Sequence, residues 1–304
     1  MRVWSMILLL VIGLTLFPGF RAKTGAGDQL VVTALGIDIQ DGAVRAVVST
    51  IDVAVEGGEE VPENTVRTGT GASLSAALAD IEQQSGRTSY LLHNKTLVLS
   101  LAAAQGEPLG VLLERLTVDS ELRPGVKIAL CRGDVEEALN TSIGVPYLRF
   151  ARQPDGWLPI VEGGAALFKN GVYAGELSDD AARGAALVDG LQSPLIYVTA
   201  AGTQRVSASR TRIAAGTEGY TLSLTLTAKV EEGGADGLDE AARQDVAAAV
   251  TESAATGVDI WGLHTLTQKQ DAAFARTVDA DFGGWLQRTA FTIEIKINYI
   301  SGRE

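Results

Sequence analysis

Hydrophobic and polar positions follow two periods along the chain, and the first folded stretch has the two-residue period of β-strands. Two β-branched runs flank Asp41-Gly42, a pattern that predicts a β-hairpin. Residues 56–72 are polar and rich in glycine, so we expect an exposed loop there. Residues 73–85 then take the helical period, with Ser73 as the N-cap.

The next segment alternates between apolar runs and amphipathic stretches. This pattern predicts two buried strands, over residues 90–101 and 126–131, and two helices, over residues 109–120 and 134–140. Residues 141–165 show no clear period and are rich in Gly and Pro. Such a composition is typical of a domain boundary or an inter-domain surface.

A second hairpin is predicted over residues 165–177, because Asn170-Gly171 is the strongest two-residue turn signal between two apolar runs. Residues 178–187 then predict a capped helix. Ser178 precedes two acidic residues, which lie at the positive end of the helix dipole.

From residue 195 onward the pattern becomes rich in strands. Strands are predicted over residues 195–200, 206–215 and 220–232, a long helix over 238–255, short helices over 271–277 and 282–287, and a final alternating strand over 291–299. We describe this unit as β-β-β-α-α-β, an order that should fold into a mostly antiparallel sheet covered by helices.

These elements predict an α+β fold, with mixed, mostly antiparallel sheets covered by helices in two to three domains. We expect an N-terminal α+β domain over residues 28–160 and a C-terminal domain over 195–304. The hairpin and helix of residues 161–194 lie between them and belong either to a separate middle segment or to the N-terminal region.

Residues 1–23 have the pattern of an export signal. Arg2 precedes an apolar run over residues 6–17, which Pro18 ends. At about 1.5 Å per residue, such a run is too short for the roughly 30 Å hydrocarbon core, but it has the length of a signal-peptide core. The alternatives are an uncleaved signal anchor, cleavage near Ala22, or a buried helix of the folded domain.

The charge of the chain limits its partners. The net charge is −12, and the first 23 residues hold basic residues but no acid, so the body is more acidic still. An acidic body is repelled by nucleic acid and by anionic headgroups. We therefore expect no nucleic-acid partner, and we expect any membrane attachment to come from the N-terminus.

Few residues of the chain offer chemistry. Cys131 is the single cysteine, which excludes an internal disulfide and a paired-cysteine metal site, and we expect it to be a buried strand residue. The chain has no HExxH, no phosphate-binding loop and no GxSxG. We expect no cofactor, no metal and no enzymatic activity.

Five stretches carry a family resemblance along most of the chain. In order, they are VVTALGIDI, RTSYLLHNKTLVLS, LTVDSELRPGVKIALCRGDVEEAL, GGAALFKNGVYAGELSDDAARGAAL, and a C-terminal helix followed by GVDIWGL and FTIEIKINY. Together they resemble the Ger(x)C family of spore germination proteins, the C subunits of nutrient germinant receptors. The resemblance spans about residues 30–300.

The resemblance implies a role without catalysis. It implies a receptor subunit on the outer face of the spore inner membrane or the cell membrane, held together with multi-span membrane subunits. The family is expected to carry a lipid on a cysteine after the signal segment, but residues 18–27 contain no cysteine. A signal anchor or the partner subunits would have to substitute for that lipid.

The family motifs supply candidate interface residues. They are Asp38, Arg87, His93, Lys95, Arg123, Asp259 and Trp261. Most of these residues also have an ordinary structural interpretation. His93 lies in an apolar stretch without a nucleophile nearby, Arg123 precedes a Pro-Gly turn, and Asp259 follows a helix end at which Gly257 is a natural left-handed cap.

Two further functions remain open from the sequence. The chain could be a free-standing extracytoplasmic protein that binds a small nutrient, which predicts a pocket with a few polar groups. It could also be an exported hydrolase of cortex peptidoglycan, with Asp38 and Asp52 as paired carboxylates. The chain has 37 acidic residues, however, so a pair of this kind is easily proposed by chance.

Overall fold

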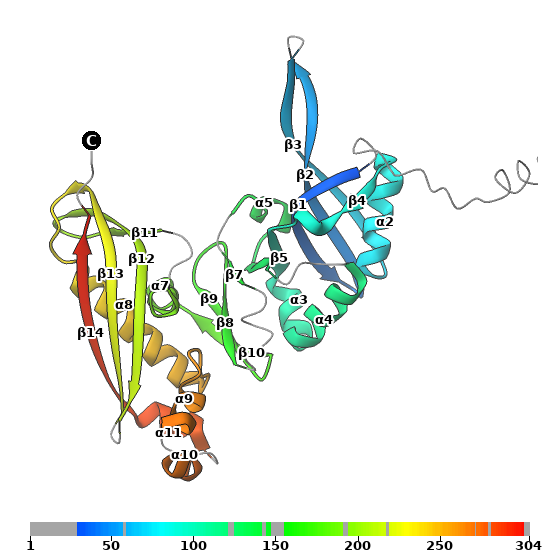
Figure 1. Ribbon diagram of the computed structural model, residues 1–304. Helices are drawn as coiled ribbons and strands as arrows, with labels where there is room; N and C mark the ends of the chain where they lie inside the picture. The colour runs from blue at the N-terminus through cyan, green and yellow to red at the C-terminus, as the bar shows by residue number, and fades with distance from the viewer. Residues whose placement is uncertain are drawn as a thin grey trace, which may run out of the picture.

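The protein is described by a computed structural model that covers residues 29–56, 59–120, 125–141, 144–146, 155–190, 194–216, 219–270, 272–278 and 281–300. These residues form three sheets, which follow one another along the chain and carry helices on their faces (Figure 1). The predicted α+β class with mixed sheets is confirmed. Within the described residues, no helix is both long and apolar enough to cross a membrane.

The first sheet is mixed, with the order β3-β2-β1-β5-β6-β7 and β4 paired to the start of β1. Its strands are β1 (Gln29–Gln40), β2 (Ala43–Glu56), β3 (Glu59–Gly71), β4 (Thr88–Tyr90), β5 (Thr96–Ser100), β6 (Lys127–Cys131) and β7 (Val145–Pro146). The central strands β1, β5 and β6 are parallel, whereas β2, β3 and β7 pair antiparallel. The hairpin at Asp41-Gly42 forms as predicted, and both residues have positive φ angles, as a tight hairpin turn requires.

Helices cover both faces of this sheet. The helices are α2 (Leu74–Ser85), α3 (Leu101–Gly106), α4 (Leu109–Ser120) and α5 (Val135–Ala138). One face packs into the largest hydrophobic cluster, which includes Leu97 and Leu99. The opposite face packs into a smaller cluster, which joins Val98 and Cys131 to α5. The central strands are therefore buried on both sides, as parallel strands usually are.

The second sheet has three antiparallel strands in the order β10-β9-β8. They are β8 (Gly156–Pro159), β9 (Ala165–Lys169) and β10 (Val172–Leu177), and α7 (Asp179–Asp189) follows them. The turn at Asn170-Gly171 and the Ser178 cap of α7 both form as predicted.

The third sheet has the order β11-β12-β13-β14. Its strands are β11 (Leu195–Val198), β12 (Gly202–Ala215), β13 (Gly219–Gly233) and β14 (Ala290–Tyr299). One face is covered by α8 (Leu238–Thr256), because Leu222, Leu224 and Leu226 of β13 point into the same buried cluster as α8. The helices α9 (Leu263–Gln270), α10 (Ala272–Val278) and α11 (Phe282–Arg288) connect α8 to β14.

Three local predictions differ from the structure. Residues 56–72 were expected to be a loop, but β3 occupies most of them, because it pairs with β2 along its whole length through backbone hydrogen bonds. Residues 90–101 are not one strand: the chain passes through a 3₁₀ turn at Leu91–His93 between β4 and β5. The C-terminal unit also contains α9, which the sequence pattern missed, so more than two helices precede β14.

Candidate functional site

Arg87 is the centre of a charged cluster on the first sheet. Its Nη1 donates to Oδ1 of Asp52 at 2.5 Å, and its Nη2 donates to the carbonyl of Gln29 at 2.6 Å. Arg67 donates to the other oxygen of Asp52 at 2.8 Å. Burial tends to raise the pKa of Asp52, but the hydrogen bonds from Arg87 and Arg67 outweigh it and hold that pKa below its ordinary value. The cluster thus ties β1, β2 and β3 together.

His93 and Lys95 lie on the surface beside this sheet. Both side chains are exposed, and so is the apolar side chain of Leu92 between β4 and β5, at 39%. The ring of His93 lies 5.4 Å from that of Tyr90. The backbone of Lys95 bonds Thr33 and Lys127, so the segment is fixed while its side chains face outward.

Asp38 lies elsewhere on the first sheet, and it is buried on β1. One of its oxygens accepts a hydrogen bond from Nε2 of Gln40 at 2.7 Å. Cys131 is fully buried, as predicted, and burial together with Glu162, Asp38 and Asp134 raises the pKa of its thiol to about 12. This thiol therefore stays protonated and unreactive at neutral pH.

Asp259 caps a helix in the C-terminal unit. Its two oxygens accept from the backbone N–H groups of Leu263 and His264 at the start of α9, both at 2.8 Å. Burial raises its pKa, and these two backbone bonds partly oppose that rise. The neighbouring Gly257 has the predicted left-handed conformation at the end of α8.

The capping turn adjoins a cleft of about 850 Å³ between the second sheet and the C-terminal helices. Asp155 joins the two sides: its Oδ1 accepts from the backbone of Asn170 at 2.8 Å and its Oδ2 from the backbone of Asp259 at 3.3 Å. Trp261 lines the cleft and packs against the core clusters of both the first and the third sheet. Its Nε1 is buried without a hydrogen-bond partner among the described residues.

The cleft presents both signs of charge. Besides Asp155 and Asp259, it is lined by Lys169, Lys269 and the aromatic ring of Phe282. The two carboxylates are engaged by backbone N–H groups, whereas the structure shows no ion pair for either lysine within the described chain. Such a lining suits a small polar ligand rather than a reaction.

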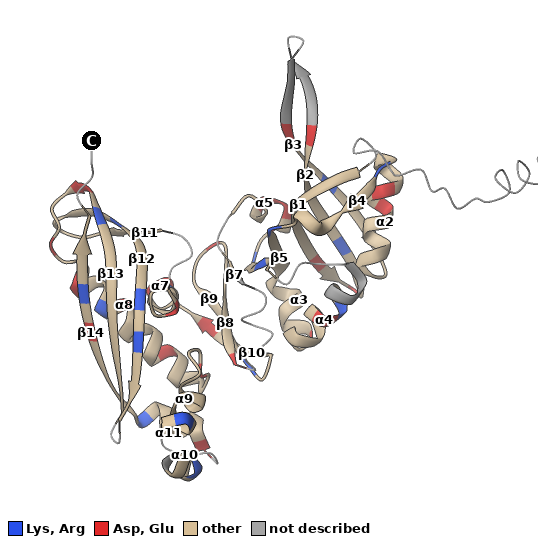
Figure 2. Cartoon of the chain, in the orientation of Figure 1, with Lys and Arg blue, Asp and Glu red and all other residues tan. Residues whose placement is uncertain are grey.

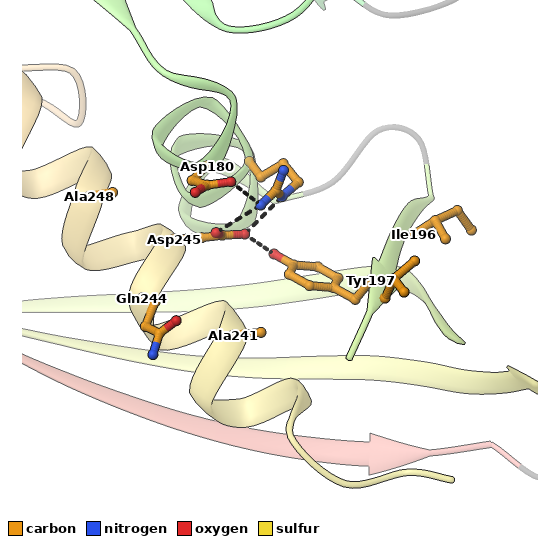
Figure 3. A pocket seen from close by; sticks show the side chains of 9 residues that line it. Asp180, Ile196, Tyr197, Ala241, Gln244, Asp245 and Ala248 are labelled. Atoms are coloured by element: carbon orange, nitrogen blue, oxygen red, sulfur yellow. Dashed lines mark hydrogen bonds and ion pairs between the residues drawn. The ribbon is translucent and has the colours of Figure 1, made fainter. Parts of the chain in front are cut away.

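A buried polar cluster that the sequence analysis missed joins the second and third sheets (Figure 3). Asp245 on α8 accepts from Nε of Arg183 at 3.0 Å and from the hydroxyl of Tyr197 at 2.8 Å. Arg183 also bonds Asp180 at 2.5 Å. Burial raises the pKa of Asp245, although Arg183 and Tyr197 oppose it, and burial likewise raises the pKa of Tyr197. All four side chains line a pocket of about 390 Å³, beside which Figure 3 labels Asp180, Tyr197 and Asp245.

One sequence signal could have found this cluster. Asp245 falls on the same helical face as Ala242, Val246 and Ala249, and an acid on an apolar stripe demands a buried partner. The partners themselves, 62 and 48 residues away in the chain, carry no local signal.

The predicted interface residues do not form one site. Arg87, His93, Lys95 and Asp38 belong to the first sheet, and Asp259 and Trp261 lie at the cleft. Arg123 lies outside the described residues. The part of the chain that the structure describes holds no group of three or more His, Cys, Asp or Glu side chains that could bind a metal ion.

The fold defines the class of the protein: an α+β protein of successive sheets with helices on their faces. Residues 27–145 match the family described as "Spore germination protein N-terminal domain". The crystal structure of the GerBC protein has a similar fold, with a TM-score of 0.53 and 14% identity over 88% of this chain and 97% of that one. No curated protein matches the chain. The family match covers less than half of the chain's 304 residues, and the likeness to GerBC is one of fold.

Proposed function

We propose that this chain is a non-catalytic subunit of a membrane-bound nutrient germinant receptor. The observation that carries the proposal is the match of residues 27–145 to the spore germination N-terminal domain, within a chain that has the GerBC fold. In this proposal the chain faces outward on the spore inner membrane or the cell membrane, and its partners are multi-span membrane subunits.

The hydrogen bonds of three acids, Asp52, Asp245 and Asp259, support a role without catalysis. Asp52 is bonded by two arginines, Asp245 by Arg183 and Tyr197, and Asp259 by the start of a helix. In each of these three carboxylates, both oxygens accept hydrogen bonds from groups that hold the fold together. A general acid or base instead needs an oxygen that can reach a substrate.

The surface at β4 and β5 is the proposed contact with a partner subunit. It combines a fixed backbone with the outward side chains of Leu92, His93 and Lys95. An exposed apolar side chain flanked by polar ones is typical of the edge of a protein interface. The cleft residues Asp259 and Trp261 belong in this proposal to the joint between sheets rather than to that contact.

Deletion of the gene in a spore-forming host tests the proposal. We expect spores to lose the response to one nutrient class and to regain it when the intact gene is restored, while germination forced by a nutrient-independent chemical stays normal. Normal germination of the deletion strain with every nutrient would overturn the proposed role.

A Leu92→Asp/Lys95→Glu variant tests the proposed contact. We expect the variant to fold but to fail to restore germination, and to lose co-purification with the multi-span subunit. Val111→Asp/Arg115→Glu, on the exposed side of α4, makes the same change of charge and is the control, which should restore both. Equal loss in the two variants would mean that β4 and β5 hold no special contact.

The cleft favours a second candidate function, the binding of a small nutrient outside the cytoplasm. Its volume, its two aromatic walls and its charges of both signs fit a small polar molecule. Amino acids and sugars would then raise the melting temperature of the purified protein, and Lys169→Ala would abolish that rise. The absence of a shift with every compound would exclude this function.

The domain boundaries near residues 160 and 194 and the mode of attachment are part of the proposal. Residues 1–23 would act as an export signal and, in the absence of a lipid-bearing cysteine, as the anchor. Replacing them with a cleavable signal and fractionating the membranes separates the two modes: release means a signal anchor, and retention means that partner subunits hold the chain.

A further inference from the structure

Among the described residues, no helix packs against the outer face of the third sheet, whereas α8 covers its inner face. In β13, alternate side chains point into the core under α8, and those between them point outward. The outward positions align in cross-strand rows: Arg210, Thr225 and Lys296 form one row, and Arg212 faces Ser223 and Glu294 in the next. We call this surface the basic face.

The basic face has a positive charge, opposite in sign to the net charge of the chain. It carries Arg205, Arg210, Arg212, Lys229 and Lys296 but only the acids Glu231 and Glu294. The chain as a whole has a net charge of −12. Figure 2 shows the basic positions side by side on β12, β13 and β14, whereas acidic positions gather elsewhere, for example on α2.

The cations of this face are mostly left without acids. Arg205 pairs with Glu231 at 3.0 Å, and Glu294 accepts from the hydroxyl of Ser223 at 2.8 Å. For Arg210, Arg212 and Lys296 no ion pair is formed within the described residues, and all three side chains are exposed. Neighbouring cations without acids repel one another, so the arrangement gains stability from an external anion.

The shape of the face indicates an extended anion rather than a small one. Arg210 and Lys296 lie on either side of β13, about 10 Å apart, given the spacing of adjacent strands. The positions between them are short hydroxyl side chains, such as Thr225 and Thr227, and none of the pockets described above is formed there. Point charges spread over a flat hydroxyl-bearing surface fit a flat array of phosphates.

Exposed aliphatic side chains border the same sheet at one end. Ile196 pairs with Arg205 and is 47% exposed, Val198 is 80% exposed, and Ile300, next to the end of β14, is 50% exposed. A basic surface with aliphatic side chains at its border is the combination that binds an anionic lipid interface.

We infer that the basic face docks the C-terminal unit onto an anionic phospholipid surface. This contact is additional to any anchor at residues 6–17 and to partner subunits, and it does not require the receptor role. The net charge of the chain argues against adhesion to a bilayer. Interactions between charges are, however, screened beyond about 10 Å, so the charge of the face nearest the bilayer determines whether the chain is attracted.

Binding of the purified full chain to vesicles tests the inference. The probes are vesicles of phosphatidylcholine alone and of phosphatidylcholine mixed with phosphatidylglycerol, and the readout is the ratio of the two affinities. Residues 1–23 carry basic residues and no acid, so they add a preference of their own for anionic vesicles, and the charge-reversal variants below leave that part unchanged. We expect a clear preference for the anionic vesicles, which disappears in about 1 M salt, where the Debye length falls to about 3 Å.

Arg210→Glu/Arg212→Glu should lower that ratio by about tenfold or more, since each cation near an anionic surface contributes about 1 kcal/mol. Lys269→Glu/Arg276→Glu is the matched control, because it changes the net charge equally but alters helices α9 and α10 instead of the sheet. Both variants should keep the melting temperature of the parent protein.

Thr225→Cys, labelled with an environment-sensitive dye, gives a second readout that does not depend on charge reversal. The dye should be shielded from an aqueous quencher on anionic vesicles only. Equal losses in the two charge-reversal variants, no preference for anionic vesicles, or an unshielded dye would each overturn the inference. So would tight binding to soluble polyphosphate without any binding to vesicles.

Discussion

The first and the third sheet differ in how many of their faces are buried. In the first sheet, consecutive residues of β5 point into two different hydrophobic clusters, and both are buried: Leu97 is 1% exposed and Val98 is fully buried. In the third sheet, Leu224 is 2% exposed, but its neighbour Thr225 lies on the basic face. The first sheet is packed from both sides and the third from one.

This difference divides the roles of the two regions. A sheet buried on both faces can change little without loss of packing, so it serves as a scaffold that presents its loops and edges. A sheet with one open face can vary its outer residues at little cost, and a functional surface can form there. The four predictions below probe this contrast, beginning with the largest expected effect.

Truncation of core side chains should separate the two sheets most strongly. Leu97→Ala and Val98→Ala should each lower the free energy of unfolding of the first sheet, by about 3 and about 2 kcal/mol. In the third sheet Leu224→Ala should cost about 3 kcal/mol, but Thr225→Ala less than about 0.5 kcal/mol. Hydrogen exchange measured peptide by peptide reads each sheet separately. A large cost for Thr225→Ala would show that the outer face is covered.

Removal of an arginine should also affect the two regions unequally. Arg183→Ala leaves the Asp245 side chain, which is only 6% exposed, without its charge partner, so we expect a loss of about 3 kcal/mol. Arg87→Ala leaves Asp52 bonded to Arg67, and both partners are partly exposed, so the loss should be about 1 kcal/mol. Urea denaturation measures both. Arg183→Lys, which keeps the charge but not the fork of donors, should recover part of the loss.

The contact between α7 and α8 should tolerate no added methyl group. A Cβ on Gly184 would lie 2.1 Å from the carbonyl oxygen of Asp245, so Gly184→Ala must push the two helices apart and should cost about 2 kcal/mol. Gly110→Ala on α4 is the control: nothing lies within 4 Å of its Cβ, so the change should be neutral or slightly stabilising. Thermal melting of the two variants measures the difference, and Gly184→Ala should melt at the lower temperature. Similar melting temperatures would contradict the close packing of α7 and α8.

Stability should depend on pH with opposite signs in the two regions. The pKa of Asp52 is below the ordinary 3.8, so its contribution is present above that pH and is lost as the pH falls through the folded-state pKa. The pKa of Asp259 is above 3.8, so its contribution is full below that pH and is lost as the pH rises through the folded-state pKa.

The two asparagine variants isolate these contributions. From pH 6 to pH 3, the stability advantage of the parent over Asp52→Asn should shrink, whereas the advantage over Asp259→Asn should grow. The slope of each difference against pH should correspond to less than one bound proton per molecule. Urea midpoints along the pH series measure both differences. Parallel slopes would refute the assigned shifts.

The sequence predicted those features whose cause is local. The two hairpins follow from Asp41-Gly42 and Asn170-Gly171, because a tight turn with positive φ depends only on the residues within it. The Ser73 and Ser178 caps are local in the same way. Strand β3 was missed because its polar residues lack an apolar alternation. Its backbone pairing and its Arg67–Asp52 ion pair both depend on the neighbouring β2.

The candidate site was harder to predict because its contacts are distant in sequence. Arg87 was singled out from its motif, but its partner Asp52, 35 residues earlier, was not paired with it. Asp259 was correctly expected in a capping turn, whereas its link to Asp155, 104 residues away, has no sequence signal. The basic face depends on the register of three strands, and net charge conceals it.

The carboxylate of Asp155 gives the molecule a mechanical property. A single rigid group is bonded to the turn of the β9–β10 hairpin and to the loop between α8 and α9. Asp155 directly precedes β8, so rotation of the second sheet against the C-terminal helices would stretch its 3.3 Å hydrogen bond from the backbone of Asp259. This bond therefore favours one alignment of the second sheet against the loop between α8 and α9.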